Sequence, residues 1–363
     1  MRLLDRYLFR ELLVPLVFCL VGIQSFVMVS TVLTDSQKIQ DSKLHFLDTI
    51  EYACAGSVET LPVILPMSLL LALLMTLSNH ARHNEITAMR AAGISLWRIC
   101  APYFVIGAFA SILLFATNEF VIPRGSDWAD RILNRYVQKP DAPATSKQTL
   151  GFHNEREHRT WAFSRFNYRA GTIEKVQIVN FEVGSRLVAD RAIYTNHTWV
   201  FSNATAYIPN RSGEPAPTLV TNRLAMPSFT ETPREMRIEL KINEYEGIRS
   251  RKKMVPLKDI LDYFWLRPGV NSSWLQTQLH QHLAMPFTCL VVVLIAIPFS
   301  AASGRRNLFF GVAGSIFICF FYFVVQQVSI ATGVGGHLPP WLAAWLPNLV
   351  FATTGIILTT RVR

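Results

Sequence analysis

Residues 60–81 have the sequence TLPVILPMSLLLALLMTLSNHA, which contains no Asp, Glu, Lys or Arg. A helix needs about 20 predominantly apolar residues to cross the hydrocarbon core of a bilayer, so this stretch predicts a transmembrane helix. Further charge-free runs occupy residues 12–34, 99–118, 283–304 and 307–360. The first three of these runs are each long enough for one crossing.

The run at 307–360 is long enough for two crossings. It is interrupted at 331–340 by ATGVGGHLPP, whose Gly and Pro residues favour a loop. We therefore predict an α-helical membrane protein with six crossings, three before and three after a long charged segment. The composition agrees, because 50% hydrophobic and 17% charged residues are too apolar for one soluble domain and too charged for a chain wholly in lipid.

The positions of the Arg residues predict the orientation of these helices. With six crossings, one side of the membrane carries ten Arg, namely Arg2, Arg6, Arg10, Arg82, Arg90, Arg98, Arg305, Arg306, Arg361 and Arg363. The short loops on the other side, 35–59 and 331–340, hold only Lys38 and Lys43. The positive-inside rule then places both termini in the cytoplasm. The first apolar run is not followed by a small-residue cleavage site, which favours a retained helix over a removed signal peptide.

The segment 124–275 must then lie outside the cytoplasm. It carries 23 Lys and Arg against 16 Asp and Glu, and its start at 137–150 is rich in Pro, Ala and Ser, as in a linker. Four runs beyond it, TWAFSRFNY, KVQIVNFEV, RLVADRAIY and TWVFSNATAY, are aromatic, β-branched and alternating. They predict an all-β domain with an apolar interior, a small sandwich, jelly roll or open barrel, in which Phe163 and Phe201 point inward. None of the five Cys lies in this segment, so a disulfide-stapled domain is excluded.

The sequence lacks three common nucleotide-binding and hydrolase motifs. No phosphate-binding loop, H-E-x-x-H or G-x-S-x-G motif occurs, so we expect no ATP hydrolysis by this chain and no catalytic residues. His80 and His83 with Glu85, and His280 with His282, have only loosely metal-like spacing, and solvated or interfacial histidines are the favoured interpretation. The membrane runs hold no ionisable Asp, Glu, Lys or Arg, which disfavours an ion-coupled transporter.

Basic residues gather at the predicted outer membrane boundary. We define this basic rim as Lys38, Lys43, Arg124, Arg131 and Arg135. On a helix the three Arg would share a face, because spacings of seven and four residues are close to whole turns. Such a face could bind phosphate. The alternative is snorkelling at the interface, or pairing with Asp127 and Asp130.

The connector NEITAMRAAGIS at 84–95 lies between the second and third crossings. Its Ala residues favour helix, Gly93 is suited to end it, and Ser95 can cap the next helix. Small side chains such as Ala88 make a thin helix that fits a groove, and Glu85 offers a carboxylate to a basic partner. We expect a coupling helix at about 79–95 that contacts a separate ATPase. The alternative is an amphipathic linker on the lipid headgroups.

The sequence also resembles a known family, the LptF/LptG permeases of lipopolysaccharide export. The connector carries the resemblance together with LPVILPMSLLLALLMTLS before it, NEFVIP at 118–123, LDRYLFREL at 4–12, LHQHLAMPFTCLVVVLIAIPFS at 279–300 and HLPPWLAAWLPNLVF at 337–351. These segments extend over nearly the whole chain. One departure is Gln281–His282, where the family often has basic residues. The WLPN segment favours the LptG branch.

The resemblance implies a domain plan and a set of partners. Residues 1–123 would form crossings one to three, 124–275 a periplasmic jelly-roll-like domain with flanking linkers, and 276–363 crossings four to six. The chain would be the permease subunit of an ABC transporter in the inner membrane of a Gram-negative bacterium, binding no cofactor or nucleic acid itself. Its partners would be a paralogous permease, two cytoplasmic ATPase subunits of the LptB type that use ATP and Mg, and periplasmic bridge proteins of the LptC and LptA type.

The resemblance also assigns residues to roles. Glu85, Ala88, Arg90 and Gly93 would contact the ATPase, and the basic rim would contact lipopolysaccharide phosphates. Two other classes stay open on the sequence. A membrane-anchored scaffold for envelope assembly would share the topology without needing a connector shaped for a groove. A polytopic lipid-modifying enzyme would need a His, Asp or Ser cluster at the membrane surface, and no convincing cluster is present.

Overall fold

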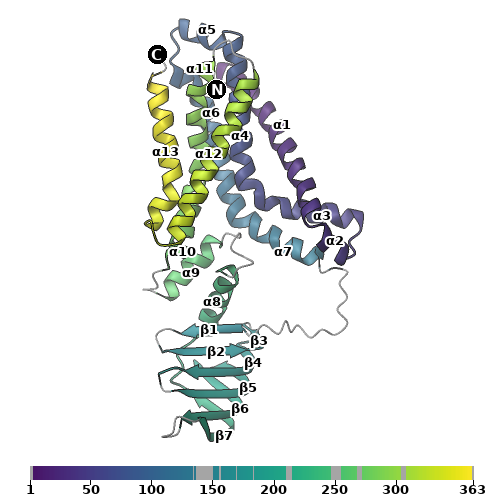
Figure 1. Cartoon of the computed structure of the whole chain (residues 1–363), viewed down its shortest axis with the longest axis vertical. Coiled ribbons are helices and arrows are strands. Elements are labelled where there is room, and N and C mark those ends of the chain that lie inside the picture. The colour runs from purple at the N-terminus through teal and green to yellow at the C-terminus, as the bar shows by residue number, and fades with distance from the viewer. Residues whose placement is uncertain are drawn as a thin grey trace. The chain divides into compact units, whose positions relative to one another are not determined.

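The structure is a computed structural model that describes residues 3–133, 135, 150–154, 157–168, 170–182, 184–209, 215–246, 255–267, 272–303 and 308–361. The chain divides into two compact units (Figure 1), one formed by residues 1–138 with 271–363 and the other by residues 139–270. Arg305 and Arg306, and nearly all of the predicted linker at 137–150, lie outside the described residues.

The first unit is entirely helical in its described residues. Its first part contains α1 (Leu3–Thr34), α2 (Ser36–Asp41), α3 (Phe46–Ser57), α4 (Leu61–Arg82), α5 (Glu85–Ala91), α6 (Leu96–Ala116) and α7 (Ile122–Leu133). Its second part contains α10 (Ser273–Ala284), α11 (Phe287–Ser303), α12 (Leu308–Val334) and α13 (Pro340–Arg361). A 3-10 turn joins α3 to α4 and a π-helical turn joins α6 to α7.

The number of helices able to cross a membrane is close to the prediction. Among the described residues, five helical stretches are long and apolar enough, and a sixth is obtained if the bent pair α10 and α11 counts as one crossing. The two halves of this pair meet at an angle of 54°. The chain is therefore a multi-pass helical protein with an inserted β-sheet unit, and the grouping of three and three stays a prediction.

The bend between α10 and α11 lies at Met285 and Pro286, within the predicted fourth crossing. The N–H of Thr288 donates to Met285 O and not to Ala284 O, which frees the Ala284 carbonyl. The side-chain Nδ2 of Asn348, from the WLPN segment on α13, donates to that carbonyl at 2.7 Å. Tyr322 Oη on α12 donates to Asn348 Oδ1 at 2.8 Å, so three helices are joined by buried hydrogen bonds.

The predicted loop at 35–59 is largely helical, which corrects the expectation of a plain connection. Within it, α3 continues through the 3-10 turn into α4, so that the second span begins at Phe46. Apolar side chains of α3 and α7 form a small separate core at Tyr52, Ala55, Ala129 and Ile132. Because α7 packs there, the boundary of the helical unit falls at residue 138 and not at the predicted 123.

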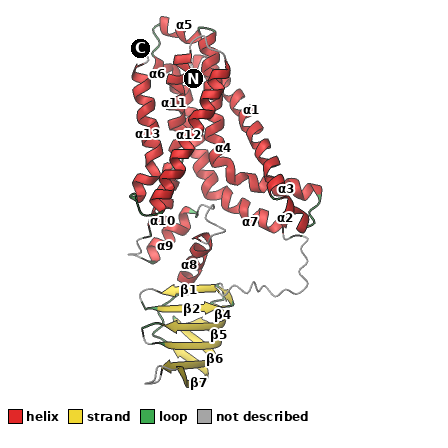
Figure 2. Ribbon diagram, in the orientation of Figure 1, coloured by secondary structure: helices red, strands yellow, loops and turns green. Residues whose placement is uncertain are grey.

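The second unit is built on an antiparallel sheet (Figure 2). Its strands are β1 (Leu150–Asn154), β2 (Arg159–Phe163), β3 (Arg165–Asn167), β4 (Thr172–Asn180), β5 (Ser185–Thr195), β6 (Thr198–Pro209) and β7 (Pro215–Met226). They pair in the order β1-β2-β4-β5-β6-β7, with β3 beside β4. Phe163 and Phe201 are fully buried in its core, in agreement with their predicted inward direction.

A line of irregular residues crosses four neighbouring strands of this sheet. The register skips Lys175 and Asp190 between β4 and β5, Asp190 and Asn203 between β5 and β6, and Asn203 and Asn222 between β6 and β7. Lys175 and Asn203 have left-handed φ values of 50° and 51°. Pairing resumes in the same register beyond each skip, because both partner strands leave out one residue. A left-handed residue that interrupts the ladder in this way bends its strand, and the buried positions change parity there, as from Phe201 to Ala204, so the apolar side chains stay inward on both sides of the line.

Two helices also belong to the second unit, so the prediction of an all-β domain was wrong in this respect. They are α8 (Pro233–Glu246) and α9 (Leu257–Leu266). The sequence signal for α8 is TPRE at 232–235. The Thr232 N–H donates to Glu235 Oε2 at 2.9 Å, and the Glu235 N–H donates to Thr232 Oγ1 at 3.2 Å. This reciprocal pair is a capping box, and Pro233 occupies the first helical turn, where it is tolerated.

The left-handed Asn203 gives a test of the bend in the sheet. We expect Asn203→Val to destabilise the protein by about 1–2 kcal/mol, because a β-branched side chain is strained in this conformation. Asn203→Gly loses the same exposed hydrogen bond to Asp190 but is expected to be close to neutral. The measurement is the thermal unfolding midpoint of the purified chain. Equal unfolding midpoints for the two variants would contradict the left-handed conformation of Asn203.

Candidate functional site

The connector between α4 and α6 forms the short helix α5 through two backbone reversals. Asn84 has a left-handed φ of 56°, a conformation that Asn tolerates, and it separates α4 from α5. At the other end Gly93 has φ 85°, with its N–H donating to Arg90 O and the N–H of Ile94 donating to Met89 O. These two bonds are the Schellman pattern, which confirms the predicted stop at Gly93.

The predicted extent of this helix was wrong. Residues 79–82 are the last turn of α4, and α5 covers only Glu85–Ala91, because the left-handed residue at 84 interrupts the helix. Ser95 does cap α6 as expected, since its side chain accepts a hydrogen bond from the N–H of Arg98 at 3.4 Å. The chain thus turns sharply on both sides of a helix of two turns.

The carboxylate of Glu85 is held by two side chains from other helices. Tyr7 Oη, on α1, donates to Glu85 Oε2 at 3.1 Å, and His80 Nδ1, on α4, lies 2.6 Å from the same oxygen. The side chain of His80 is 1% exposed and that of Glu85 is 33% exposed. We call Tyr7, His80 and Glu85 the anchor of α5. The sequence indicated an exposed acid at this position and gave no sign that Tyr7 would bind it.

A second ion pair fixes the start of α1 at the same end of the helical unit. Arg98, in the first turn of α6, pairs with Asp5 at 2.8 Å. The first turns of α1 are therefore tied to α4 and α5 through Tyr7 and to α6 through Asp5. The Tyr7–Glu85 hydrogen bond thus joins α5 directly to α1.

The outward surface of α5 consists mainly of small residues. Ala88, Ala91 and Ala92 are exposed, and so is Gly93, around which a Cβ atom would meet nothing within 4 Å. Arg90 is exposed on the same short helix. Met89 and Ile94 pack against the core of the bundle instead. This arrangement leaves room for a partner to approach the backbone closely.

Two of the four histidines differ from the favoured interpretation, whereas His83 is exposed and agrees with it. His80 and His282 are buried and not solvated, and His282 lies in α10 close to the bend. His83 Nδ1 lies 2.9 Å from Asn79 O on its own helix, apart from the anchor. Among the described residues, no group of three His, Cys, Asp or Glu is arranged to hold a metal ion.

Lys38, a member of the basic rim, is engaged in an ion pair. Lys38 Nζ lies 2.6 Å from Asp35 Oδ1, although the Lys38 side chain is 65% exposed. Tyr52 Oη also donates to Asp35 Oδ2, at 2.8 Å. Burial of Asp35 favours its neutral form, but the hydrogen bonds from Lys38 and Tyr52 outweigh this and lower its pKa below the ordinary value. The Asp35 carboxylate therefore stays charged and holds Lys38.

Arg135 differs from its prediction. It lies beyond the end of α7 at Leu133, so it does not share a helical face with Arg124 and Arg131. It binds Asp48 and Glu51 of α3 instead, with a distance of 3.1 Å from Arg135 Nη1 to Glu51 Oε2. The predicted alternative partners, Asp127 and Asp130, have side chains outside the described set. Arg135 thus helps to join α7 to α3.

The three other rim residues, Lys43, Arg124 and Arg131, are exposed. Lys43 follows α2 with a left-handed φ of 49°. Arg124 and Arg131 are on α7. Figure 1 shows α2, α3 and α7 at the end of the helical unit opposite to α5. The structure therefore separates the predicted coupling residues from the predicted substrate residues by the length of the long helices.

Comparison with known proteins decides the family. The family described as "Lipopolysaccharide export system permease LptF/LptG" matches residues 6–361. The chain belongs to the LptF/LptG family. It is 22% identical over 309 residues to the lipopolysaccharide export system permease protein LptF of Escherichia coli strain K12, covering 84% of this chain and 80% of that protein. The protein of the same name from Shigella flexneri matches with the same identity and coverage.

Membership of the LptF/LptG family establishes the broad role of the chain. It is a multi-pass permease of lipopolysaccharide export in the inner membrane, as the resemblance predicted. The match describes both branches together, so the assignment to the LptG branch stays a prediction.

The anchor of α5 predicts a change in local mobility. In Tyr7→Phe the tyrosine donor is lost, and we expect amide hydrogen exchange in residues 85–91 to become about fivefold faster, since the net value of one such hydrogen bond is about 1 kcal/mol. Tyr52→Phe is the matched control, because it removes a tyrosine–carboxylate bond at the opposite end of the unit. Exchange in α5 that is unchanged by Tyr7→Phe would show that the anchor does not hold the helix.

Proposed function

We propose that this chain is one permease subunit of an ATP-driven exporter that removes lipopolysaccharide from the inner membrane and passes it toward the outer membrane. Membership of the LptF/LptG family supports this role. The observation that carries the proposal is α5, a short helix with an exposed small-residue surface whose Glu85 is bonded to α1 and α4.

In this proposal α5 connects the membrane helices to a separate cytoplasmic ATPase. Two copies of that ATPase bind ATP and Mg, while this chain is non-catalytic and pairs with a paralogous permease. Ala88, Arg90 and Gly93 contact the ATPase groove. Glu85 has two tasks, because one part of its carboxylate is held by Tyr7 and His80 while its exposed part faces the ATPase. Movement of the ATPase then reaches α1 through the anchor.

The proposed orientation places both termini and α5 in the cytoplasm and the sheet unit in the periplasm. The distribution of Arg residues supports it. In Figure 1 both ends of the chain and α5 lie at the same end of the helical unit, as an even number of crossings requires. Periplasmic bridge proteins of the LptC and LptA type receive the lipid from the sheet unit. The family's jelly roll is supported by the bend across β4 to β7, which lets one sheet fold over an apolar interior.

The basic rim contacts substrate phosphates in the same proposal. Lys43, Arg124 and Arg131 are exposed at the end of the unit opposite to α5, where they can donate charge-assisted hydrogen bonds. Lys38 and Arg135 reach a phosphate only by exchanging a carboxylate partner for it. The carboxylates of Asp35, Asp48 and Glu51 therefore compete with the anionic lipid for these two bases.

The coupling role is tested by reversing the charge of Glu85. We expect Glu85→Lys to reduce copurification of the ATPase and export of lipopolysaccharide, because it breaks the anchor and repels a basic partner. Glu59→Lys, an exposed charge reversal before α4, is the matched control and should leave copurification unchanged. Wild-type copurification together with wild-type export in Glu85→Lys would refute the coupling role. If even the unaltered chain copurifies with no ATPase, it is a membrane-anchored scaffold.

The role of the rim is tested with Arg124→Glu combined with Arg131→Glu. We expect this double reversal to lower photo-crosslinking of lipopolysaccharide in proteoliposomes strongly and single Ala changes to lower it modestly, because each charge-assisted bond contributes about 1.5–3 kcal/mol before screening. Arg135→Glu also disturbs the contact with α3, so its effect must be compared with its unfolding midpoint. Crosslinking at the wild-type level in the double variant would reduce these residues to interfacial anchors.

A further inference from the structure

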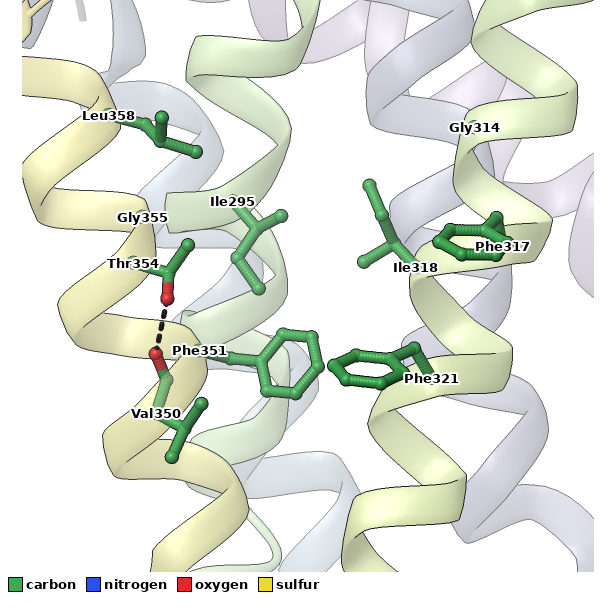
Figure 3. A pocket seen from close by; sticks show the side chains of 10 residues that line it. All are labelled: Ile295, Gly314, Phe317, Ile318, Phe321, Val350, Phe351, Thr354, Gly355 and Leu358. Atoms are coloured by element: carbon green, nitrogen blue, oxygen red, sulfur yellow. Dashed lines mark hydrogen bonds between the residues drawn. The ribbon is translucent and has the colours of Figure 1, made fainter.

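A groove of about 280 Å³ lies between α11, α12 and α13 (Figure 3). Ile295 of α11 lies on one side, Phe317 and Phe321 of α12 on another, and Phe351 and Thr354 of α13 on the third. Phe351 is 8% exposed, whereas Phe317 is 69% exposed. The groove therefore has a buried inner wall and an open rim of aromatic side chains.

The groove offers no free hydrogen-bonding group among its described side chains. Its one polar side chain is Thr354, whose hydroxyl donates to Val350 O at 2.7 Å on the same helix, as the dashed line in Figure 3 shows. A polar ligand would lose its hydration here without gaining a partner, which is unfavourable. A hydrocarbon ligand has no hydrogen bonds with water to lose. The chemistry of the lining thus selects an acyl chain.

Two glycines give the groove its shape. A Cβ atom on Gly355 would lie 3.1 Å from the side chain of Leu294, so this glycine lets α13 pack closely on α11 and close the inner wall. A Cβ atom on Gly314 would meet nothing within 4 Å, so this glycine leaves one side of the groove open. The ring of Phe321 lies against that of Phe351, with centroids 5.9 Å apart, and joins the two aromatic walls.

The surroundings and the size of the groove decide its occupant. Its α12 and α13 walls belong to the two helical parts of the charge-free run 307–360, which are apolar enough to lie in hydrocarbon, where lipid fills an open apolar groove. A partner helix is about 10–12 Å in diameter and cannot enter a space of this volume, although one of its side chains could. A single acyl chain is thin enough to lie along it.

The position along the helices decides the leaflet. The groove uses the N-terminal half of α12 and the C-terminal half of α13, up to Leu358, about one turn before α13 ends at Arg361. In the proposed orientation this is the cytoplasmic half of the membrane. We propose that the groove binds one acyl chain of a phospholipid of the cytoplasmic leaflet. The leaflet assignment rests on the orientation given under the proposed function; the binding of an acyl chain does not.

The site is therefore distinct from the basic rim, which contacts the exported lipid in the proposed function and lies at the opposite end of the helical unit. A phospholipid chain in this groove fills the space between α12 and α13 and makes dispersion contacts with the rings of Phe321 and Phe351. The bound lipid supports the packing of the last two helices while α1 and α5 move.

The test uses the chain in its complex, placed in nanodiscs of phosphatidylethanolamine and phosphatidylglycerol that include a phosphatidylglycerol with a diazirine in the middle of one acyl chain. After illumination, mass spectrometry of peptides locates the adducts. We expect adducts at residues 314–321 and 350–358 in the unaltered chain. Gly314→Leu fills the groove and should abolish them. Thr354→Leu fills it from the other wall and should have the same effect.

Gly22→Leu is the matched control, because Gly22 is an exposed helical glycine of α1 around which a Cβ atom would also meet nothing within 4 Å. It should leave the groove adducts unchanged. Adducts that persist in both filling variants would overturn the proposal. Labelling of the groove by a photoactivatable lipopolysaccharide that displaces the phospholipid probe would overturn the assignment to the cytoplasmic leaflet. A crosslink from position 317 to another protein chain would show that a protein, and not a lipid, occupies the groove. None of these readouts depends on ATP hydrolysis or export, so their failure is separable from failure of the proposed function.

Discussion

A backbone carbonyl within hydrocarbon must have a hydrogen-bond partner, and the arrangement of the last four helices depends on this constraint. The bend at Met285 and Pro286 frees the Ala284 carbonyl, and Asn348 satisfies it from α13. Because Asn348 also accepts from Tyr322 of α12, the bend fixes the positions of both later helices. Removal of Asn348 would leave the buried Ala284 carbonyl unpaired, whereas Tyr322 keeps its bond to Thr288 at 2.8 Å; an unpaired buried group is more unfavourable than the loss of an exposed bond. The packing that forms the groove beside α11 follows from this network.

At the cytoplasmic end in the proposed orientation, polar contacts add to the apolar packing that connects the helices. The two-turn helix α5 is too short to be stable by itself, since isolated helices of this length are marginal in water. It is held by its Schellman end, by Met89 and Ile94 against the core, and by the Glu85 carboxylate. The anchor therefore combines two properties that a transmitting element requires, an exposed surface for a partner and a fixed connection to α1 and α4.

At the opposite end of the helical unit, neighbouring carboxylates change how the basic rim can bind an anion. Lys38 and Arg135 have acidic partners within the unit. The side chains of Asp35 and Asp48 are only 19% and 10% exposed, so an anionic ligand that replaced them would leave a largely buried carboxylate without its base, which is costly. Selectivity for a multiply charged lipid can arise in this way, because several exchanges must occur together.

The sequence by itself determined the membrane segments, the inserted sheet and the family. Charge-free runs are local properties, and alternation in TWAFSRF or TWVFSNA reports burial of one face without knowledge of the neighbours. The helix end at Gly93 and the helix cap at Ser95 could also be predicted, because helix ends depend on residues within one turn. The TPRE capping box of α8 is a local signal of the same kind, but the helix was not predicted because the preceding runs favoured strands.

Only the tertiary structure decided which side chains meet. Tyr7 and Glu85 are 78 positions apart, and Arg135 and Asp48 are 87 apart, so no spacing rule joins them. The interruption of the strand pairing at Lys175 and Asn203 could not be read either, because it depends on the neighbouring strands across the sheet. Proline favours a kink in a helix, and Pro286 lies at the bend. The partner Asn348 could not be read from the sequence, since that contact requires α13 to fold back on α10. Interactions between distant segments depend on how helices and strands pack, and this packing is set by the whole chain at once.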